Sequence, residues 1–204
     1  VTGLIVHDTA QYWTVFGQAV IIGLIQIGGM GVITMAIFVA IISGKKIGLQ
    51  QRSIMQESIS APQIGGIVRF TNMILKVAFT TELVAALIMA PIFCKQFGLG
   101  KGLWYALFHS ISAFCNAGFD LMGVVEPYSS LTYYAAEPVI NFVIMFLIIF
   151  GGIGFLTWND MLKNRHHFKK YRLQSKIIIV TTLTIILVPA LYMFIFEFKD
   201  YPLS

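Results

Sequence analysis

Charged side chains are scarce in this sequence. They make up 11% of its 204 residues, whereas a soluble domain carries about 25%. Two long stretches, 9–44 and 138–159, contain no Asp, Glu, Lys or Arg. This scarcity predicts an integral membrane protein. The net charge of +5 is then loop charge that orients helices in the membrane, not a surface for nucleic acid.

Cysteine is also rare, and no signal peptide is visible. Cys94 and Cys115 form no CxxC or metal-binding spacing, so neither a redox nor a metal role is indicated. We expect both to be small buried hydrophobic residues. The chain begins with Val1-Thr-Gly-Leu4, without Met, and we expect it to be a piece of a longer protein.

The apolar segments predict four membrane-spanning helices. Ten of the fourteen Lys and Arg residues lie in the loops 43–69 and 159–176, which the positive-inside rule places in the cytoplasm. The acidic loop 120–137 then faces outward, and the protein crosses the cell membrane several times. The predicted spans are Trp13–Ile42, Phe70–Phe93, Pro138–Asn159 and 177–196.

A fifth apolar segment, roughly Leu103–Cys115, is too short to span a bilayer and is followed by Asn116-Ala-Gly-Phe119. A short helix, a glycine turn and then a long helix predict a re-entrant pore loop, with Gly118 giving the backbone freedom to turn carbonyl groups toward a watery cavity. The alternative is that Gly118 only caps a short buried helix. The motif by itself favours that alternative, and the rest of the chain favours the pore loop.

An internal repeat supports the pore loop. Thr2-Gly3 and Ala117-Gly118 each precede a polar stretch, an uncharged helix, a double glycine and a basic loop. The single glycines are 115 residues apart, and the pairs Gly28-Gly29 and Gly151-Gly152 are 123 apart. We therefore predict an all-α membrane protein of tandem helix–pore-loop–helix units. Residues 1–48 end a first unit, 49–163 form a second, and 164–204 begin a third.

Two further features concern the support of the pore. Glu82 lies inside a predicted span, and because a buried charge needs a partner we expect it to brace the pore loop and not to bind the transported ion. Gly28, Gly29, Gly151 and Gly152 are expected to let helices pack closely beneath the pore loop. His109 is expected to be a hydrogen-bonded core residue.

The motifs resemble the potassium-translocating subunit of the Trk/Ktr/HKT superfamily, in particular its bacterial KtrB type. The resemblance rests on segments spread over most of the chain: Thr2-Gly-Leu4, Gly17-Gln18, Gly23-Leu-Ile-Gln-Ile-Gly-Gly29, Gly44-Lys-Lys-Ile-Gly-Leu49, Glu82 with Ala85-Ala86-Leu87, Phe108-His-Ser-Ile-Ser-Ala-Phe114, Asn116-Ala-Gly-Phe119 and Gly151-Gly-Ile-Gly-Phe155.

The resemblance implies four units around one pore, each with one filter glycine, and Gly3 and Gly118 would be two of the four. It assigns the filter to Val1, Thr2, Gly3, Cys115, Asn116, Ala117 and Gly118. It also implies a homodimer in lipid, regulated by a cytosolic ring of nucleotide-binding RCK subunits. The basic segments 43–52 and 163–176 would contact that ring or serve membrane topology alone. The remaining filters and a gating loop are expected beyond Ser204.

The predicted function is passive or sodium-assisted uptake of K⁺ through backbone carbonyls, with no organic cofactor and no enzymatic activity. The acidic outer loop, with Asp8 and Asp120, is expected to raise the local cation concentration. Mixed Na⁺ and K⁺ transport stays open. An intramembrane enzyme using His7, Asp8, Glu82, His109 or Asp160 is an alternative without a matching motif. A structural membrane subunit is a third, against which the repeat argues.

Overall fold

The computed structural model describes residues 3–31, 67–165 and 167–197. The chain divides into two compact units, Val1–Gly152 and Ile153–Ser204. The described residues of both units are helical and contain no strand, as an all-α membrane protein requires. Val1, Thr2, the basic segment 43–52 and a short interfacial helix predicted near 49–59 lie outside the described residues.

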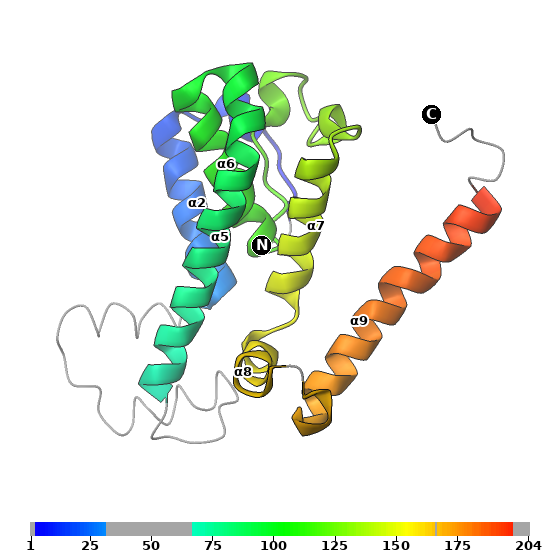
Figure 1. The fold of residues 1–204 in the computed structure, drawn as a ribbon. Coiled ribbons are helices and arrows are strands. Elements are labelled where there is room, and N and C mark those ends of the chain that lie inside the picture. Colours follow the sequence, from blue (N-terminus) through cyan, green and yellow to red (C-terminus); the bar gives the residue numbers. More distant parts are fainter. Residues whose placement is uncertain (1–2, 32–66, 166, 198–204) are drawn as a thin grey trace. The chain divides into compact units, whose positions relative to one another are not determined.

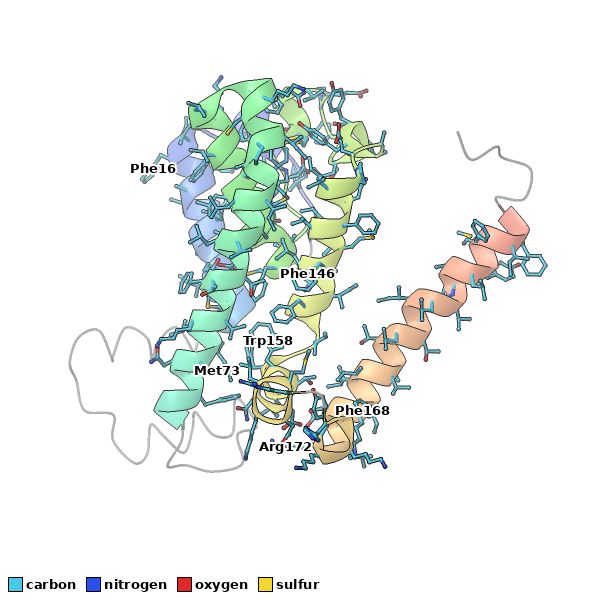
Figure 2. All side chains as sticks on the ribbon, viewed as in Figure 1. Phe16, Met73, Phe146, Trp158, Phe168 and Arg172 are labelled. Atoms are coloured by element: carbon cyan, nitrogen blue, oxygen red, sulfur yellow. The ribbon has the colours of Figure 1, made fainter. Side chains whose placement is uncertain are left out.

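The first unit is built around the short helix α6, Leu99–Phe114. This helix packs against α2 (Val15–Met30), α5 (Ile67–Phe97) and α7 (Pro138–Gly152), which surround it in Figure 1. The core beneath it is aromatic and aliphatic, with Phe93 and Phe108 fully buried. Phe16 instead projects from α2 away from the bundle (Figure 2) and is 78% exposed, as expected for a face toward lipid.

The loops of this unit contain short helical turns. Helix α1, Thr9–Tyr12, precedes α2, and two 3₁₀ turns, Met122–Val124 and Thr132–Tyr134, lie between α6 and α7. Tyr134 is buried, its hydroxyl donates a hydrogen bond to the Gln96 side chain at the end of α5, and Asn141 Nδ2 donates to the Tyr134 carbonyl over 3.0 Å. Burial raises the pKa of Tyr134 to about 12, so this hydroxyl stays protonated at physiological pH.

Two of the described helices are long and apolar enough to cross a membrane, Phe70–Phe97 and Leu173–Phe196. The spans predicted over Trp13–Ile42, as a tilted or kinked helix, and over Pro138–Asn159 are each interrupted by a glycine turn where the structure describes them, and the latter counts as a span only if the helices on either side of its turn form one broken span. Helix α2 ends at Met30 because Gly31 has φ 83°, and α7 ends at Gly152, where Gly154 with φ 89° separates it from the next helix. Glycine adopts such angles without a steric cost, so the double-glycine segments end helices. Residues 32–42 lie outside the described part.

The boundaries of α5 and α6 also correct the sequence analysis. Helix α5 continues to Phe97, and α6 begins at Leu99 and not near Leu103. Only Gly98, with φ 80°, separates the two helices, whereas the predicted segments Phe70–Phe93 and Leu103–Cys115 left nine residues between them. The apolar periodicity of α6 begins late because its first turn carries Lys101 and two glycines, which hide the start of the helix.

The second unit contains α8 (Phe155–Asn164), a 3₁₀ turn (Phe168–Lys170), α9 (Leu173–Tyr192) and a π-helical turn, Met193–Glu197. Asp160 on α8 is buried and accepts hydrogen bonds from Ser175 Oγ at 2.6 Å and Arg172 N at 3.1 Å. Arg172, labelled in Figure 2, also places its Nε 3.7 Å from the same carboxylate. The carboxylate therefore stabilises the start of α9, a role that sequence analysis missed when it considered Asp160 as an acid–base residue.

Candidate functional site

The C-terminus of α6 is closed by a Schellman motif centred on Asn116. Asn116 has φ 52°, its N–H donates to the Ala113 carbonyl at 3.1 Å, and the Ala117 N–H donates to the Ser112 carbonyl at 2.8 Å. This is the bonding pattern of a left-handed helix cap, and asparagine is the residue after glycine that tolerates it best. Asn116 Nδ2 also donates to the Ile148 carbonyl of α7 over 3.3 Å.

Because Asn116 caps the helix, Gly118 is free for another role. Its φ is 76°, which confirms the predicted positive angle and excludes the alternative in which Gly118 is itself the cap. The Ser112 hydroxyl donates to the Phe119 carbonyl over 2.5 Å and ties the backbone after Gly118 to α6. The turn 116–119 is thus held from both sides while Gly118 keeps a conformation that side chains resist.

Gly3 lies directly against Gly118. Its φ is 69°, and a Cβ built on Gly3 would be 2.8 Å from the Ala117 carbonyl oxygen and 3.0 Å from Gly118 Cα. A Cβ on Gly118 would be 3.2 Å from Gly3 Cα. The two glycines that the repeat pairs over 115 residues of sequence therefore have similar positive φ angles and adjoin in space. The facing of the Asn116 and Ala117 carbonyls toward a pore axis stays a prediction.

Glu82 is buried on α5, with 2% of its surface exposed. Its two carboxylate oxygens accept hydrogen bonds from Gln26 Nε2 of α2 at 2.9 and 3.0 Å. Its backbone carbonyl accepts from Ser110 Oγ of α6 over 2.6 Å. Glu82 thus joins α2 and α5 to α6, and the prediction that it is buried and bonded to a neighbouring helix is confirmed.

The double glycines bring α2 and α7 against the end of α6. A Cβ on Gly29 would overlap the Cys115 side chain, and a Cβ on Gly151 would overlap the Phe114 carbonyl oxygen. Close packing at these two positions is confirmed. At Gly152 it is wrong, because a Cβ there would be in ordinary contact, 3.9 Å from Asn116 Nδ2. Cys115 and Cys94 are half-buried rather than fully buried as predicted.

Three glutamines in the first described segment, residues 3–31, each form a hydrogen bond to a residue in the second, residues 67–165. Gln11 Nε2 donates to the Gly123 carbonyl at 2.7 Å, Gln18 Oε1 accepts from Trp104 Nε1 at 2.8 Å, and Gln26 bonds to Glu82 as above. Sequence analysis missed this series. The signal for these bonds is the presence of amide side chains in an uncharged, mostly apolar stretch of sequence, because a polar group in an apolar helix needs a partner.

His109 on α6 is 2% exposed and bonded through both ring nitrogens. Nδ1 lies 2.7 Å from the Tyr105 carbonyl, and Nε2 accepts from the Leu121 N–H at 3.3 Å. Those bonds require the neutral ring with its proton on Nδ1. The predicted core role of His109 is confirmed. A pocket of about 260 Å³ beside it, lined by Asn116, Gly118 and Asp120 among others, adjoins the turn.

The Asp8 side chain lies inside the fold and not on its surface. Its side chain is buried, with 7% exposed, and three backbone N–H groups donate to its carboxylate. The Asp8 carboxylate is therefore engaged inside the fold, and its effect on the local cation concentration stays a prediction. Asp120 is half-buried and accepts from the Met122 N–H at 2.9 Å.

Comparison with known proteins places this chain. Residues 1–195 match the TrkH family, described as cation transport protein. The chain is 44% identical over 200 residues to the Ktr system potassium uptake protein B of Bacillus subtilis, and the match covers 98% of the chain and 44% of that protein.

Two further relatives agree. The potassium/sodium uptake protein NtpJ of Enterococcus hirae is 37% identical over 89% of the chain and 39% of its own length. The Ktr system potassium uptake protein B of Vibrio alginolyticus is 31% identical over 97% of the chain and 42% of its length. The chain thus spans about two-fifths of the length of these relatives, and it belongs to the TrkH family of cation transport proteins.

Proposed function

We propose that the full-length protein takes up K⁺ across the membrane, and that residues 1–3 and 115–118 are two of the segments of its selectivity filter. The observation that carries this proposal is the contact of Gly3 with Gly118, both at positive φ, at the end of a short helix that is enclosed by three others. Paired glycine turns of this kind let two chain segments approach one cavity with their carbonyl groups.

The tandem repeat is supported by matched positions at the two ends of α2 and α7. Helices α2 and α7 begin at Val15 and Pro138, which are 123 residues apart, and the glycines at their far ends, Gly31 and Gly154, have the same separation and φ of 83° and 89°. Equal offsets in helix start and in an unusual backbone angle favour an evolutionary duplication. The unit boundaries 1–48, 49–163 and 164–204 are proposed on this basis.

Two features of the structure would favour a cation at the turn. The C-terminus of α6, with its partial negative charge, ends at Phe114, and its C-cap Cys115 directly precedes the turn. Carbonyl oxygens of the two segments would replace part of the hydration shell of K⁺. Gln26, Glu82 and Ser110 would hold the pore helix in place while ions pass.

Mixed transport of K⁺ and Na⁺ is a second candidate, because one relative at 37% identity is named a potassium/sodium uptake protein. Sodium assistance, a homodimer and a cytosolic RCK ring belong to the proposal through the resemblance to Ktr systems. The segment 163–176, with six Lys and Arg residues, is the described candidate for contact with that ring.

Uptake of ⁸⁶Rb⁺ by cells that lack their own K⁺ uptake systems and produce the full-length protein tests the function. We expect uptake that saturates and that excess K⁺ inhibits strongly. Inhibition by Na⁺ as strong as that by K⁺ would support the mixed transporter, and uptake no higher than in cells without the protein would contradict the proposal.

A further inference from the structure

The loop after Gly3 is bonded to the loop after Gly118 through one buried carboxylate. Asp8 Oδ1 accepts from the N–H groups of Ala10 and Gln11 at 2.9 and 3.1 Å, so it caps α1. Asp8 Oδ2 accepts from the Tyr128 N–H at 3.0 Å, 120 residues further along the chain. One side chain therefore orders its own loop and holds a second one.

A second contact reinforces the first. Gln11 Nε2 donates to the Gly123 carbonyl at 2.7 Å, and a Cβ built on Gly123 would overlap the Asp8 carboxylate. Gly123 is buried, and the space beside its Cα is filled by the Asp8 carboxylate, so a larger residue at 123 would displace that carboxylate. We call Asp8, Gln11, Gly123 and Tyr128 the loop junction.

The two connections that meet at the loop junction differ in length. Val15 of α2 follows Gly3 by 12 residues, whereas Pro138 of α7 follows Gly118 by 20. The longer connection contains the 3₁₀ turn Met122–Val124 and Tyr128, which has φ 60°. The additional length thus supplies the groups that receive Asp8 and Gln11.

From these contacts we infer that Asp8 is a positioning residue for ion selectivity, which holds the segment of Gly3 in register with that of Gly118 through the loop junction. The inference rests on the proposed function. Asp8 is five residues from Gly3, a span of at most about 18 Å of extended chain. A carboxylate with three backbone donors is a strong fixed point, because hydrogen bonds to an ionised acceptor are about twice as strong as neutral ones.

Asp8→Asn in the full-length protein separates this role from capping. Asparagine caps helices as well as aspartate does, so Oδ1 keeps its bonds to Ala10 and Gln11. The amide that replaces Oδ2 is a donor and faces the Tyr128 N–H, so the bond from Tyr128 to residue 8 is lost while the bond from Gln11 to Gly123 stays. We expect the preference for K⁺ over Na⁺ in uptake to fall on the order of tenfold, the equivalent of one charged hydrogen bond, with an unchanged amount of protein in the membrane.

Glu126→Gln is the matched control, because it removes the same charge from an exposed position of the loop that Asp8 contacts. We expect it to keep the wild-type selectivity. If both variants instead weaken uptake of every cation equally, Asp8 acts through its charge and the inference is wrong. Wild-type selectivity in Asp8→Asn would also overturn the inference about Asp8, and the proposed function would stay intact. Absence of K⁺ uptake by the wild type would instead contradict the proposed function itself.

Gly123→Ala tests the junction from its other side. Its methyl group would displace the Asp8 carboxylate, so we expect the same loss of selectivity. Asp8→Asn and Gly123→Ala together should then be no worse than either alone, because each breaks the same contact. Additive losses would show two independent effects and contradict a shared junction.

Discussion

Replacement of Glu82 tests whether the carboxylate supports the pore by hydrogen bonding or by its charge. Glu82→Leu leaves Gln26 Nε2 without its acceptor inside the contact between α2 and α5. An unsatisfied buried donor costs about 1–3 kcal/mol, and a hydrogen bond to a charged group contributes about 1.5–3 kcal/mol. Glu82→Gln can still accept one bond from Gln26 through its amide oxygen. We therefore expect the glutamine variant to lose about half as much stability as the leucine variant.

A double-mutant cycle makes this prediction specific. Gln26→Leu alone leaves Glu82 unpaired, whereas Gln26→Leu with Glu82→Leu replaces both polar partners with apolar ones. The double variant should recover part of the loss, with a coupling energy of about 1–3 kcal/mol. Thermal unfolding of the purified full-length protein in detergent measures each step. Additive effects, or equal loss of stability and transport in Glu82→Gln and Glu82→Leu, would refute the bonding account and indicate an essential charge.

Two more predictions concern packing and capping. Gly29→Ala and Gly151→Ala should each destabilise the assembled protein by about 1–3 kcal/mol through overpacking against Cys115 and Phe114, whereas Gly152→Ala should be tolerated. Selectivity should be nearly unchanged in the protein that still folds. Size-exclusion profiles and flux assays check this, and normal assembly of the first two variants would contradict it. Asp160→Ala should destabilise the second unit by about 1–3 kcal/mol because Ser175 Oγ and the Arg172 N–H lose their acceptor, whereas Asp160→Asn should be milder. Proteolysis near residue 172 should rise in Asp160→Ala. Equal protection of the wild type and both variants would refute the role of Asp160 in stabilising the start of α9.

The local sequence predicted individual residue environments better than the ends of the helices. Gly3 and Gly118 could be paired in advance because the repeat offset depends on sequence alone. The positive φ of Gly118 could be predicted because a turn after a short helix requires it. The burial of Glu82 followed from the cost of a charge in an apolar span.

What could not be predicted depends on contacts between distant segments. The ends of α2 and α7 were misplaced because an apolar run continues through Gly31 and Gly154, and hydropathy does not report a backbone turn. The burial of Asp8 was not predicted, because its carboxylate is bonded to Tyr128, 120 residues away. The role of Asn116 as the helix cap was missed because its bonds form only once the turn has folded.

The most direct test of the filter is a comparison of Gly118→Ser with Gly98→Ser in the full-length protein. Both glycines have positive φ, 76° and 80°, so serine introduces a similar backbone strain at each. Gly118 adjoins Gly3, whereas a Cβ on Gly98 would meet open space at the turn between α5 and α6. In parallel K⁺ and Na⁺ flux assays, we expect Gly118→Ser to lose the preference for K⁺ and Gly98→Ser to keep it. Wild-type selectivity in Gly118→Ser, or the same loss in both variants, would contradict the filter assignment.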